Sequence, residues 1–208
     1  MHEMTHIAIW VVASGMVAEL LGYLLHRLLH SGWIRWLSAS HMKHHMLLYG
    51  PLQKQRPSED YIDATVDRLA IGNIGVEWLA PTAALLVIAG AILWAFKVTF
   101  LHQVIFFATV VGWSFVMFSY LHDRMHIKNF WMERNPLLKA WFRRSRRLHD
   151  IHHRMLNDAG LMDRNFGIGF FLFDRLFGTL SPQQESFNQY GYAAAKERFR
   201  YLETPRAG

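Results

Sequence analysis

The chain has 208 residues, with 22 Lys and Arg against 16 Asp and Glu, 13 His and no Cys. Without Cys, the sequence excludes a disulfide scaffold, a thiolate zinc site, an iron–sulfur cluster and a thiol nucleophile, so any metal chemistry must use His, Asp or Glu. The net charge of +6 fits an anionic membrane surface or a nucleic acid. The placement of the charges along the chain decides between these two partners.

Three apolar stretches, residues 7–25, 76–96 and 98–121, each have close to the ~20 residues that cross a hydrocarbon core as a helix. All but one of the 22 Lys and Arg lie in residues 26–75 and 122–208. Because Lys and Arg gather on the cytoplasmic side of membrane proteins, the sequence predicts an integral, multi-pass membrane protein whose N-terminus is outside and whose two polar segments are cytoplasmic. Topology thus explains the basic excess, and no nucleic-acid partner is expected.

We expect one domain over residues 1–208, an all-α membrane bundle with a cytoplasmic, histidine-rich cap for two metals. A cleavable signal peptide ending near Ser38-Ala39-Ser40 is the competing interpretation of the first stretch. The apolar core is too long for a signal peptide, and no basic residue precedes it. Cleavage would also remove His26 and His30, whose spacing is notable. Pro51 and Pro57 mark a loop in the first polar segment.

Ten of the thirteen histidines fall into four short motifs in the order HxxxH, HxxHH, HxxxH, HxxHH. By chance a chain of this composition has roughly 0.8 HxxxH but only about 0.05 HxxHH motifs, so two copies of HxxHH indicate a function. On a helix, residues three and four apart project from one face, and each motif can offer two or three imidazoles to one centre. The ten are His26, His30, His41, His44, His45, His122, His126, His149, His152 and His153.

The predicted topology places all four motifs on one side of the membrane. His6 and His102 each lie 20 residues before a motif, which is about 30 Å of helix, and with His2 they are excluded as ligands. Ten imidazoles exceed the four to six ligands of one ion, so two metals with four or five His each are expected. Imidazole suits Fe, Zn, Cu and Ni alike. A metal pair within reach of lipid chains favours redox-active iron, which activates O₂ and abstracts hydrogen from C–H bonds.

With these motifs the sequence resembles the fatty acid hydroxylase / sterol desaturase superfamily of membrane di-iron oxygenases. The resemblance covers about residues 20–180 and includes Asn165-Phe-Gly167 and Asp174-Arg-Leu-Phe-Gly-Thr179, with Phe173 where the family usually has Trp. It implies two iron ions held by the ten histidines, O₂ as co-substrate, and a hydroxylated or desaturated lipid as product. Zinc can substitute for iron in a purified sample.

The family also implies a separate electron donor, a b-type cytochrome or ferredoxin with its reductase. The basic run Arg143, Arg144, Arg146 and Arg147 is a candidate dock for an acidic carrier, and contact with anionic headgroups is an equal alternative. The chain has no room for a fused cytochrome domain. Its small size favours a bacterial inner membrane over the endoplasmic reticulum.

Four polar residues are candidates for contacts behind the metal ligands. Glu19 lies seven residues before His26, on the same helical stripe, and can contact a ligand His, a substrate headgroup or another bundle residue. Asp123 and Asp150 follow the first His of their motifs, so they point outward or lie behind the ligands. Asn165 is a further candidate, and a turn with Gly167 is its alternative role.

The apolar stretch 166–177 predicts an interfacial or re-entrant helix that closes the site, with Asp174 and Arg175 forming a structural ion pair. The aromatic residues fall into two expected classes. Most Trp residues are expected at the lipid face or interface, and a few rings are candidates for an acyl tunnel. The first class is Trp10, Trp78, Trp94, Trp113 and Trp131; the second is Phe106, Phe107, Trp113 and Phe118.

The leading hypothesis is O₂-dependent hydroxylation of a lipid C–H bond, most simply on an acyl chain. A desaturase uses the same site, and the sequence does not separate the two reactions. A sterol or carotenoid hydroxylase is a further alternative, although carotenoid enzymes tend to have HxxxxH where this chain has HxxxH. A zinc hydrolase or a metal-binding protein without enzymatic activity represents a different class, but zinc hydrolysis needs only three protein ligands and a base.

Overall fold

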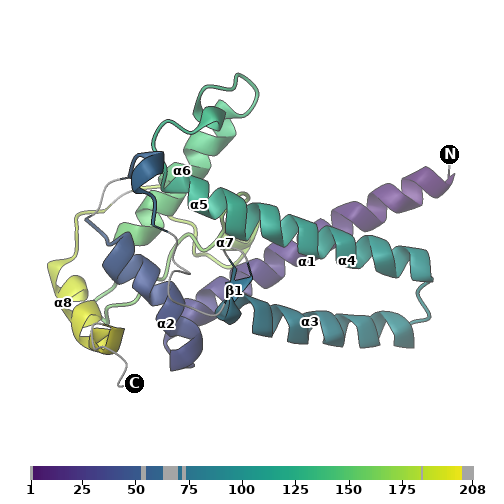
Figure 1. Cartoon of the computed structure of the whole chain (residues 1–208), viewed down its shortest axis with the longest axis horizontal. Coiled ribbons are helices and arrows are strands. Elements are labelled where there is room, and N and C mark those ends of the chain that lie inside the picture. Colours follow the sequence, from purple (N-terminus) through teal and green to yellow (C-terminus); the bar gives the residue numbers. More distant parts are fainter. Residues whose placement is uncertain (1, 53–54, 63–69, 72–73, 184, 203–208) are drawn as a thin grey trace.

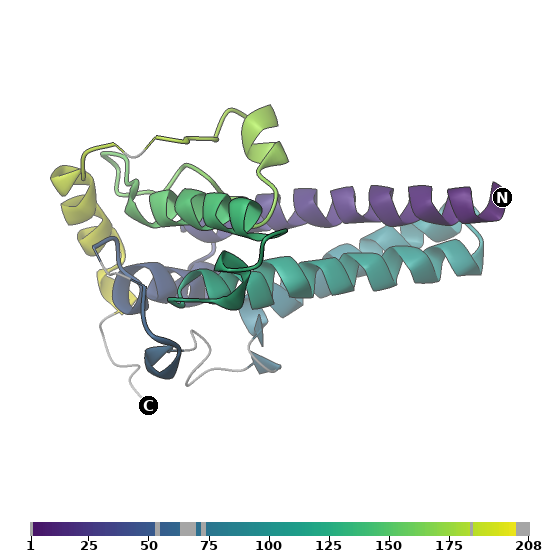
Figure 2. The same ribbon diagram turned by 90° about the horizontal axis from the view of Figure 1, so that it is seen from above.

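The computed structural model describes residues 2–52, 55–62, 70–71, 74–183 and 185–202. It consists of a long helical bundle and a cap of short helices and loops at one end of that bundle (Figures 1 and 2). The N-terminus lies at the far end of the bundle, and the last described helix lies in the cap (Figure 2). Of the 22 Lys and Arg, Lys54, Arg68 and Arg206 lie outside the described residues.

Three long helices form the bundle: α1 (His2–Ser31), α3 (Val76–Ala95) and α4 (Phe100–Ser114). A π-helical segment, η3 (Phe115–Leu121), and a short helix, α5 (His122–Met125), continue α4 without a break. The segments Glu3–Ser31, Trp78–Ala95 and Phe100–Met125 are long and apolar enough to cross a membrane. The prediction of an all-helical fold with three membrane-length helices is confirmed.

Two helices of the bundle begin or end at residues other than those predicted. The third apolar stretch is predicted from residue 98, but α4 begins two residues later, because Thr99 is extended and precedes the first helical residue. Lys97 takes a positive φ of 52° in the turn between α3 and α4, a conformation that few non-glycine residues adopt. The first helix continues past residue 25 to Ser31, so His26 and His30 lie on its last turns.

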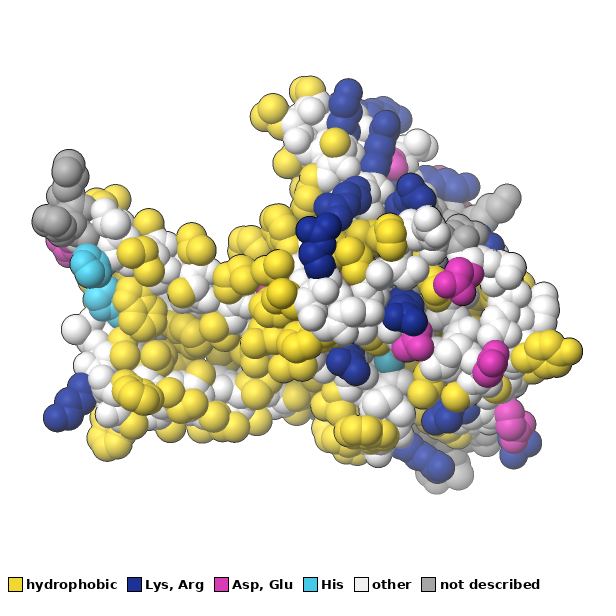
Figure 3. Space-filling model, turned by 180° about the vertical axis from the view of Figure 1, so that it is seen from behind, with side chains coloured by type: hydrophobic (Ala, Val, Ile, Leu, Met, Phe, Trp, Pro, Cys, Tyr) yellow, Lys and Arg dark blue, Asp and Glu magenta, His cyan; other side chains and the backbone are white. Residues whose placement is uncertain are grey.

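The core of the bundle lies between α1 and α4, where Ala18, Phe106 and Val110 are buried. Helix α3 buries little of its surface, and Val87 and Ile88 are 73% and 56% exposed. A helix that exposes apolar side chains over this length needs an apolar surrounding. Figure 3 shows the same contrast, with hydrophobic side chains covering the bundle and Lys and Arg gathered over the cap.

The cap wraps around the end of the bundle that carries the histidine motifs. Its longest element, α6, lies beside the continuation of α4 (Figure 1). Two two-residue strands pair in antiparallel fashion with Ala70 opposite Gly75 and Ile71 opposite Ile74. The cap elements are α2 (Arg35–Lys43), η1 (His44–Leu48), η2 (Ser58–Asp60), β1 (Ala70–Ile71), β2 (Ile74–Gly75), η4 (Trp131–Glu133), α6 (Lys139–Arg154), α7 (Leu172–Leu176), α8 (Gln189–Arg198) and η5 (Arg200–Leu202).

The stretch 166–177 corrects one expectation. Only α7 is helical there, and residues 166–171 form an irregular loop. The backbone N–H groups of Phe166 and Gly167 donate to the Asp174 carboxylate at 2.7 Å each, which bends the chain back on itself in place of a helical turn. The expected ion pair is therefore wrong: Asp174 is fully buried and binds backbone and Thr179, while Arg175 is exposed.

Candidate metal centre

The fold brings the four histidine motifs to one place, where the ends of α1 and α5 meet α2, η1 and α6. The first motif lies on the last turns of α1, and the third lies on α5 and the residue after it. The second motif runs from α2 into the π-helix η1, and the fourth occupies the last turns of α6. All four sit at the same end of the bundle, as ligands of one centre must.

The imidazoles form two groups, and within each group one ring nitrogen per residue lies within 4.8 Å of all the others. We call them the five-histidine group and the four-histidine group. They touch each other, since the rings of His45 and His153, one from each group, have centroids 4.0 Å apart. The first group is His44, His122, His126, His149 and His153; the second is His26, His30, His45 and His152.

Each HxxHH motif divides its adjacent histidines between the two groups. His44 belongs to the five-histidine group and His45 to the four-histidine group, and His153 and His152 divide in the same way. Successive residues of an α-helix point about 100° apart, so an adjacent pair can serve two neighbouring centres but not one. Two adjacent histidines in each HxxHH motif therefore allow one short segment to contribute to both groups.

His41 is the one histidine of the ten that falls outside both groups. Its Nε2 nevertheless lies 3.0 Å from Nε2 of His30 and 3.1 Å from Nε2 of His45, and its side chain is buried. It therefore borders the four-histidine group. Of the histidines excluded as ligands, His102 pairs with Thr99 and stacks on Trp10 at the far end of the bundle.

Backbone carbonyls hold three of the rings in place. Nδ1 of His26 donates to the carbonyl of Phe166 at 2.5 Å, and Nδ1 of His152 donates to the carbonyl of Arg164 at 2.6 Å. In the other group, Nδ1 of His153 donates to the carbonyl of Tyr49 at 2.8 Å. A carbonyl only accepts, so the proton is on Nδ1 and the lone pair is on Nε2, which is the arrangement of a metal-binding histidine.

Several inward nitrogens lack any hydrogen-bond partner although they are buried. They include Nε2 of His26, Nε2 of His44 and Nε2 of His122. Buried polar atoms in proteins are nearly always satisfied, and lone pairs that converge without a donor are suited to a bound cation. The imidazole donors of each group therefore fit a metal ion.

Burial favours the neutral form of seven cap histidines, which are His41, His44, His45, His126, His149, His152 and His153. It lowers the pKa of the cap histidines that lie outside the membrane-length helices, and for His152 the value falls to about 4. Neighbouring histidines lower several of these values further, because two positive imidazolium groups repel each other. Near neutral pH these seven rings are thus in the form that coordinates a metal.

The loop 164–167 supplies two of the three carbonyl anchors and is itself fixed by two side chains. Asn165 takes a positive φ of 54°, and its side-chain amide donates to the carbonyls of Leu148 and Ser181. Asp174 accepts from the N–H groups of Phe166 and Gly167. A Cβ at position 167 would lie 2.8 Å from the Asp174 carboxylate, which explains the glycine.

The remaining polar candidates have other partners. The buried carboxylate of Glu19 accepts a 2.7 Å hydrogen bond from the Trp113 indole, so Glu19 joins α1 to α4. Asp150 accepts from Gln55, and burial raises its pKa to about 6. Asp123 lies 3.7 Å from Nδ1 of His122. Asn165 contacts backbone on both sides of the loop rather than a histidine ring.

The basic run on α6 is divided by burial. Arg146 is 4% exposed, bonds to the Glu133 carboxylate and donates to the carbonyls of Arg124 and Ile127, so it links α6 to α5 and to the segment that follows α5. The other three arginines of the run are exposed. A docking surface for an acidic partner is thus reduced to Arg143, Arg144 and Arg147.

Two aromatic residues at the site lie outside the four histidine motifs. Tyr49 supplies a carbonyl to His153, and its ring stacks on His126 with centroids 4.3 Å apart. Trp78, expected at the lipid face, lies beside the four-histidine group with its ring 6.3 Å from His26 and 5.8 Å from His41. Tyr49 follows His45 by four residues, a helical spacing that offers the one sequence hint.

Comparison with known proteins agrees with the motifs. The family model described as fatty acid hydroxylase matches residues 11–179, which include all four histidine motifs and the loop that anchors them. No curated protein and no solved structure matches the chain. The matched region is most of the chain and contains both histidine groups, and the chain belongs to the fatty acid hydroxylase family.

Proposed function

We propose that the protein is a membrane di-iron oxygenase that hydroxylates a C–H bond of a lipid, on its acyl chain. The observation that carries the proposal is the pair of adjoining groups of five and four imidazoles at the end of a membrane-length bundle. Family membership supports an enzyme that acts on lipids. The ten motif histidines are the proposed ligands, with His41 bordering the four-histidine group.

The reaction consumes the lipid, O₂, two electrons and two protons, and yields the hydroxylated lipid and water. Two iron ions held by the histidines would supply the reduction of O₂ and the cleavage of the C–H bond. The chain's own residues hold the rings in one orientation through the carbonyls of Phe166, Arg164 and Tyr49. Burial of the imidazoles excludes water from the reacting atoms, which limits side reactions.

The electrons come from a separate carrier, a b-type cytochrome or a ferredoxin with its reductase. Exposed Arg143, Arg144 and Arg147 on α6 offer an acidic carrier a surface next to the fourth histidine motif. The excess of Lys and Arg over the cap supports a cytoplasmic histidine site and an N-terminus outside. We place the protein in a bacterial inner membrane.

Isotope labelling tests this function directly. Protein loaded with iron and supplied with an electron-donor system, bilayer lipids and ¹⁸O₂ should yield a lipid that carries one ¹⁸O atom, detected by mass spectrometry. Hydroxylation takes its oxygen from O₂, so label from H₂¹⁸O should not enter the product. A lipid that instead loses two hydrogens, without oxygen gain, would identify a desaturase that uses the same site.

The matched control is the same protein loaded with zinc. Zinc binds imidazole well but has no redox chemistry, so the zinc form should give no labelled lipid. Turnover of a lipid ester by the zinc form would contradict the oxygenase proposal and favour a hydrolase.

A further inference from the structure

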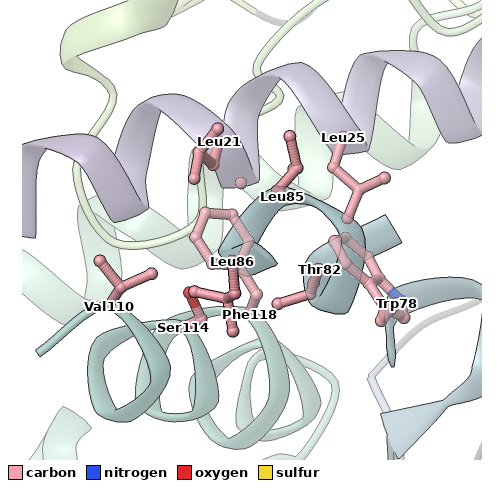
Figure 4. A pocket seen from close by; sticks show the side chains of 10 residues that line it. Leu21, Leu25, Trp78, Thr82, Leu85, Leu86, Val110, Ser114 and Phe118 are labelled. Atoms are coloured by element: carbon pink, nitrogen blue, oxygen red, sulfur yellow. The ribbon is translucent and has the colours of Figure 1, made fainter. Parts of the chain in front are cut away.

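A pocket lies between α1, α3 and α4, within the depth of the membrane-length helices (Figure 4). Its volume is about 40 Å³. Apolar side chains form most of the lining, and its polar side chains, apart from the Trp78 indole, are the hydroxyls of Thr82 and Ser114. The lining residues are Leu21, Gly22, Leu25, Trp78, Thr82, Leu85, Leu86, Val110, Ser114 and Phe118.

One end of the pocket lies about one helical turn from a member of each histidine group. Gly22 is one helical turn before His26 of the four-histidine group, and Phe118 is four residues before His122 of the five-histidine group. The Phe118 ring lies directly on Gly22, where any Cβ would overlap it. Trp78 closes the same end, with its ring 6.3 Å from those of His26 and Phe118.

The pocket is long in the direction of the helices. Its lining runs from Trp78 to Leu86 on α3 and from Phe118 back to Val110 on α4, which is about 12 Å of helix in each case at 1.5 Å per residue. A narrow apolar space of this length suits an extended hydrocarbon chain and excludes a charged headgroup, because desolvating an unpaired charge is costly.

We propose that this pocket binds the tail of a lipid that enters sideways from the bilayer and lies parallel to the helices. This inference rests on the proposed function and specifies how the substrate lies. The lipid's polar head stays near the histidine end, where the membrane-length helices finish, and the tail points toward the bilayer centre. Carbons close to the head then face the histidine groups, and the terminal methyl lies beyond Leu86.

Entry of a chain requires the pocket to widen, and α3 is the helix that can allow this. The Trp78–Ala95 segment has none of its residues buried inside the protein. A helix bordered mainly by lipid can move outward without breaking a packed core. Residue 86 on α3 then sets the depth that the tail can reach.

Chain-length profiles test the proposal. Leu86→Trp fills the far end of the pocket, so turnover of 16- to 18-carbon substrates should fall at least 10-fold relative to 8- to 10-carbon substrates. Leu86→Ala should shift the preference toward longer chains. Val87→Trp is the control, because Val87 is 73% exposed and outside the pocket, and its profile should match the wild type. Equal profiles for all four proteins would overturn the assignment of the pocket.

The position of the new oxygen tests the orientation of the chain. Fragmentation of the product in the mass spectrometer should place the hydroxyl within the first few carbons from the head. A hydroxyl at the methyl end would show that the chain enters in the opposite direction and would overturn the proposed orientation.

A binding measurement separates this proposal from the proposed function. A palmitic acid analogue with a mid-chain diazirine, photolysed with the protein in lipid nanodiscs, should label residues 78–86 and 110–118 in a manner that unlabelled palmitate suppresses. Leu86→Trp should lose this saturable labelling and Val87→Trp should keep it. If the lipid gains no oxygen and loses no hydrogens, but palmitate still suppresses the labelling, the proposed function is wrong and the assignment of the pocket is retained. Labelling that palmitate does not suppress would overturn the pocket itself.

Discussion

Replacing His152 with Ala should reduce the metal content of the iron-loaded protein to about half and lower lipid oxidation by more than about 100-fold. His152 is one of four nitrogen donors in its group, and its Nδ1 is already anchored to the Arg164 carbonyl. Losing contacts behind a ligand alone typically costs about 10- to 100-fold in affinity or activity, and losing the ligand costs more. Metal analysis by mass spectrometry and the ¹⁸O assay measure the two effects.

A second donor of the same group and a distant histidine provide comparisons within the same protein. His45→Ala removes another donor of the four-histidine group and should give the same result as His152→Ala. His102→Ala is the matched control, because His102 pairs with Thr99 at the opposite end of the bundle. It should keep both the metal and the activity. A folded His102→Ala protein without activity, or a His152→Ala protein with full metal content, would contradict the assignment.

Replacing Asp174 with Asn should weaken metal binding by about 10- to 100-fold although Asp174 touches no ligand ring. Its carboxylate accepts from the N–H groups of Phe166 and Gly167 and from Thr179 Oγ1 at 2.7–2.8 Å. Burial raises the pKa of this carboxyl, and the hydrogen bonds oppose that rise. The amide NH₂ of Asn would face a backbone N–H of the loop, so a donor would meet a donor. The loop should then shift, and His26 should lose its hydrogen bond to the Phe166 carbonyl.

The expected loss is confined to one group. Phe166 and Arg164 anchor His26 and His152, both of the four-histidine group, whereas Tyr49 anchors His153 from a different segment. When a chelator is added to the iron-loaded variant, iron should therefore be released in two phases. One phase should be faster than in the wild type, and the other should keep the wild-type rate. Asp60→Asn, a change at an exposed carboxylate in η2, should leave both phases unchanged. Equal acceleration of both phases would indicate general loosening of the cap and would contradict this role for Asp174.

Local patterns in the sequence predict much of this architecture. Apolar length identifies the three membrane-length helices, and the spacing of histidines four apart identifies one-sided clusters, because both depend on helix geometry alone. The family resemblance is confirmed. The assignment of the ten histidines as ligands stays a prediction, and the structure adds that nine of them gather in two groups.

The rest depends on contacts between distant segments. Arg146 belongs to a basic run that suggests an exposed surface. It is buried instead, because it pairs with Glu133, thirteen residues away, and so links two cap segments. Asp174 and Arg175 are adjacent, which suggests an ion pair, but their side chains diverge and the carboxylate turns inward. The anchoring of His26 comes from a main-chain carbonyl 140 residues away. A carbonyl is present at every residue, so no side-chain pattern marks it.

The divided histidine pairs have a consequence for how the centre assembles. One short stretch of η1, His44 and His45, and one of α6, His152 and His153, each carry a donor for both groups. An ion that enters either group fixes the backbone of both stretches, and so orders two donors of the other group before its ion arrives. The entropy cost of ordering is then borne largely by the first ion. The second ion should consequently bind at a smaller entropy cost than the first.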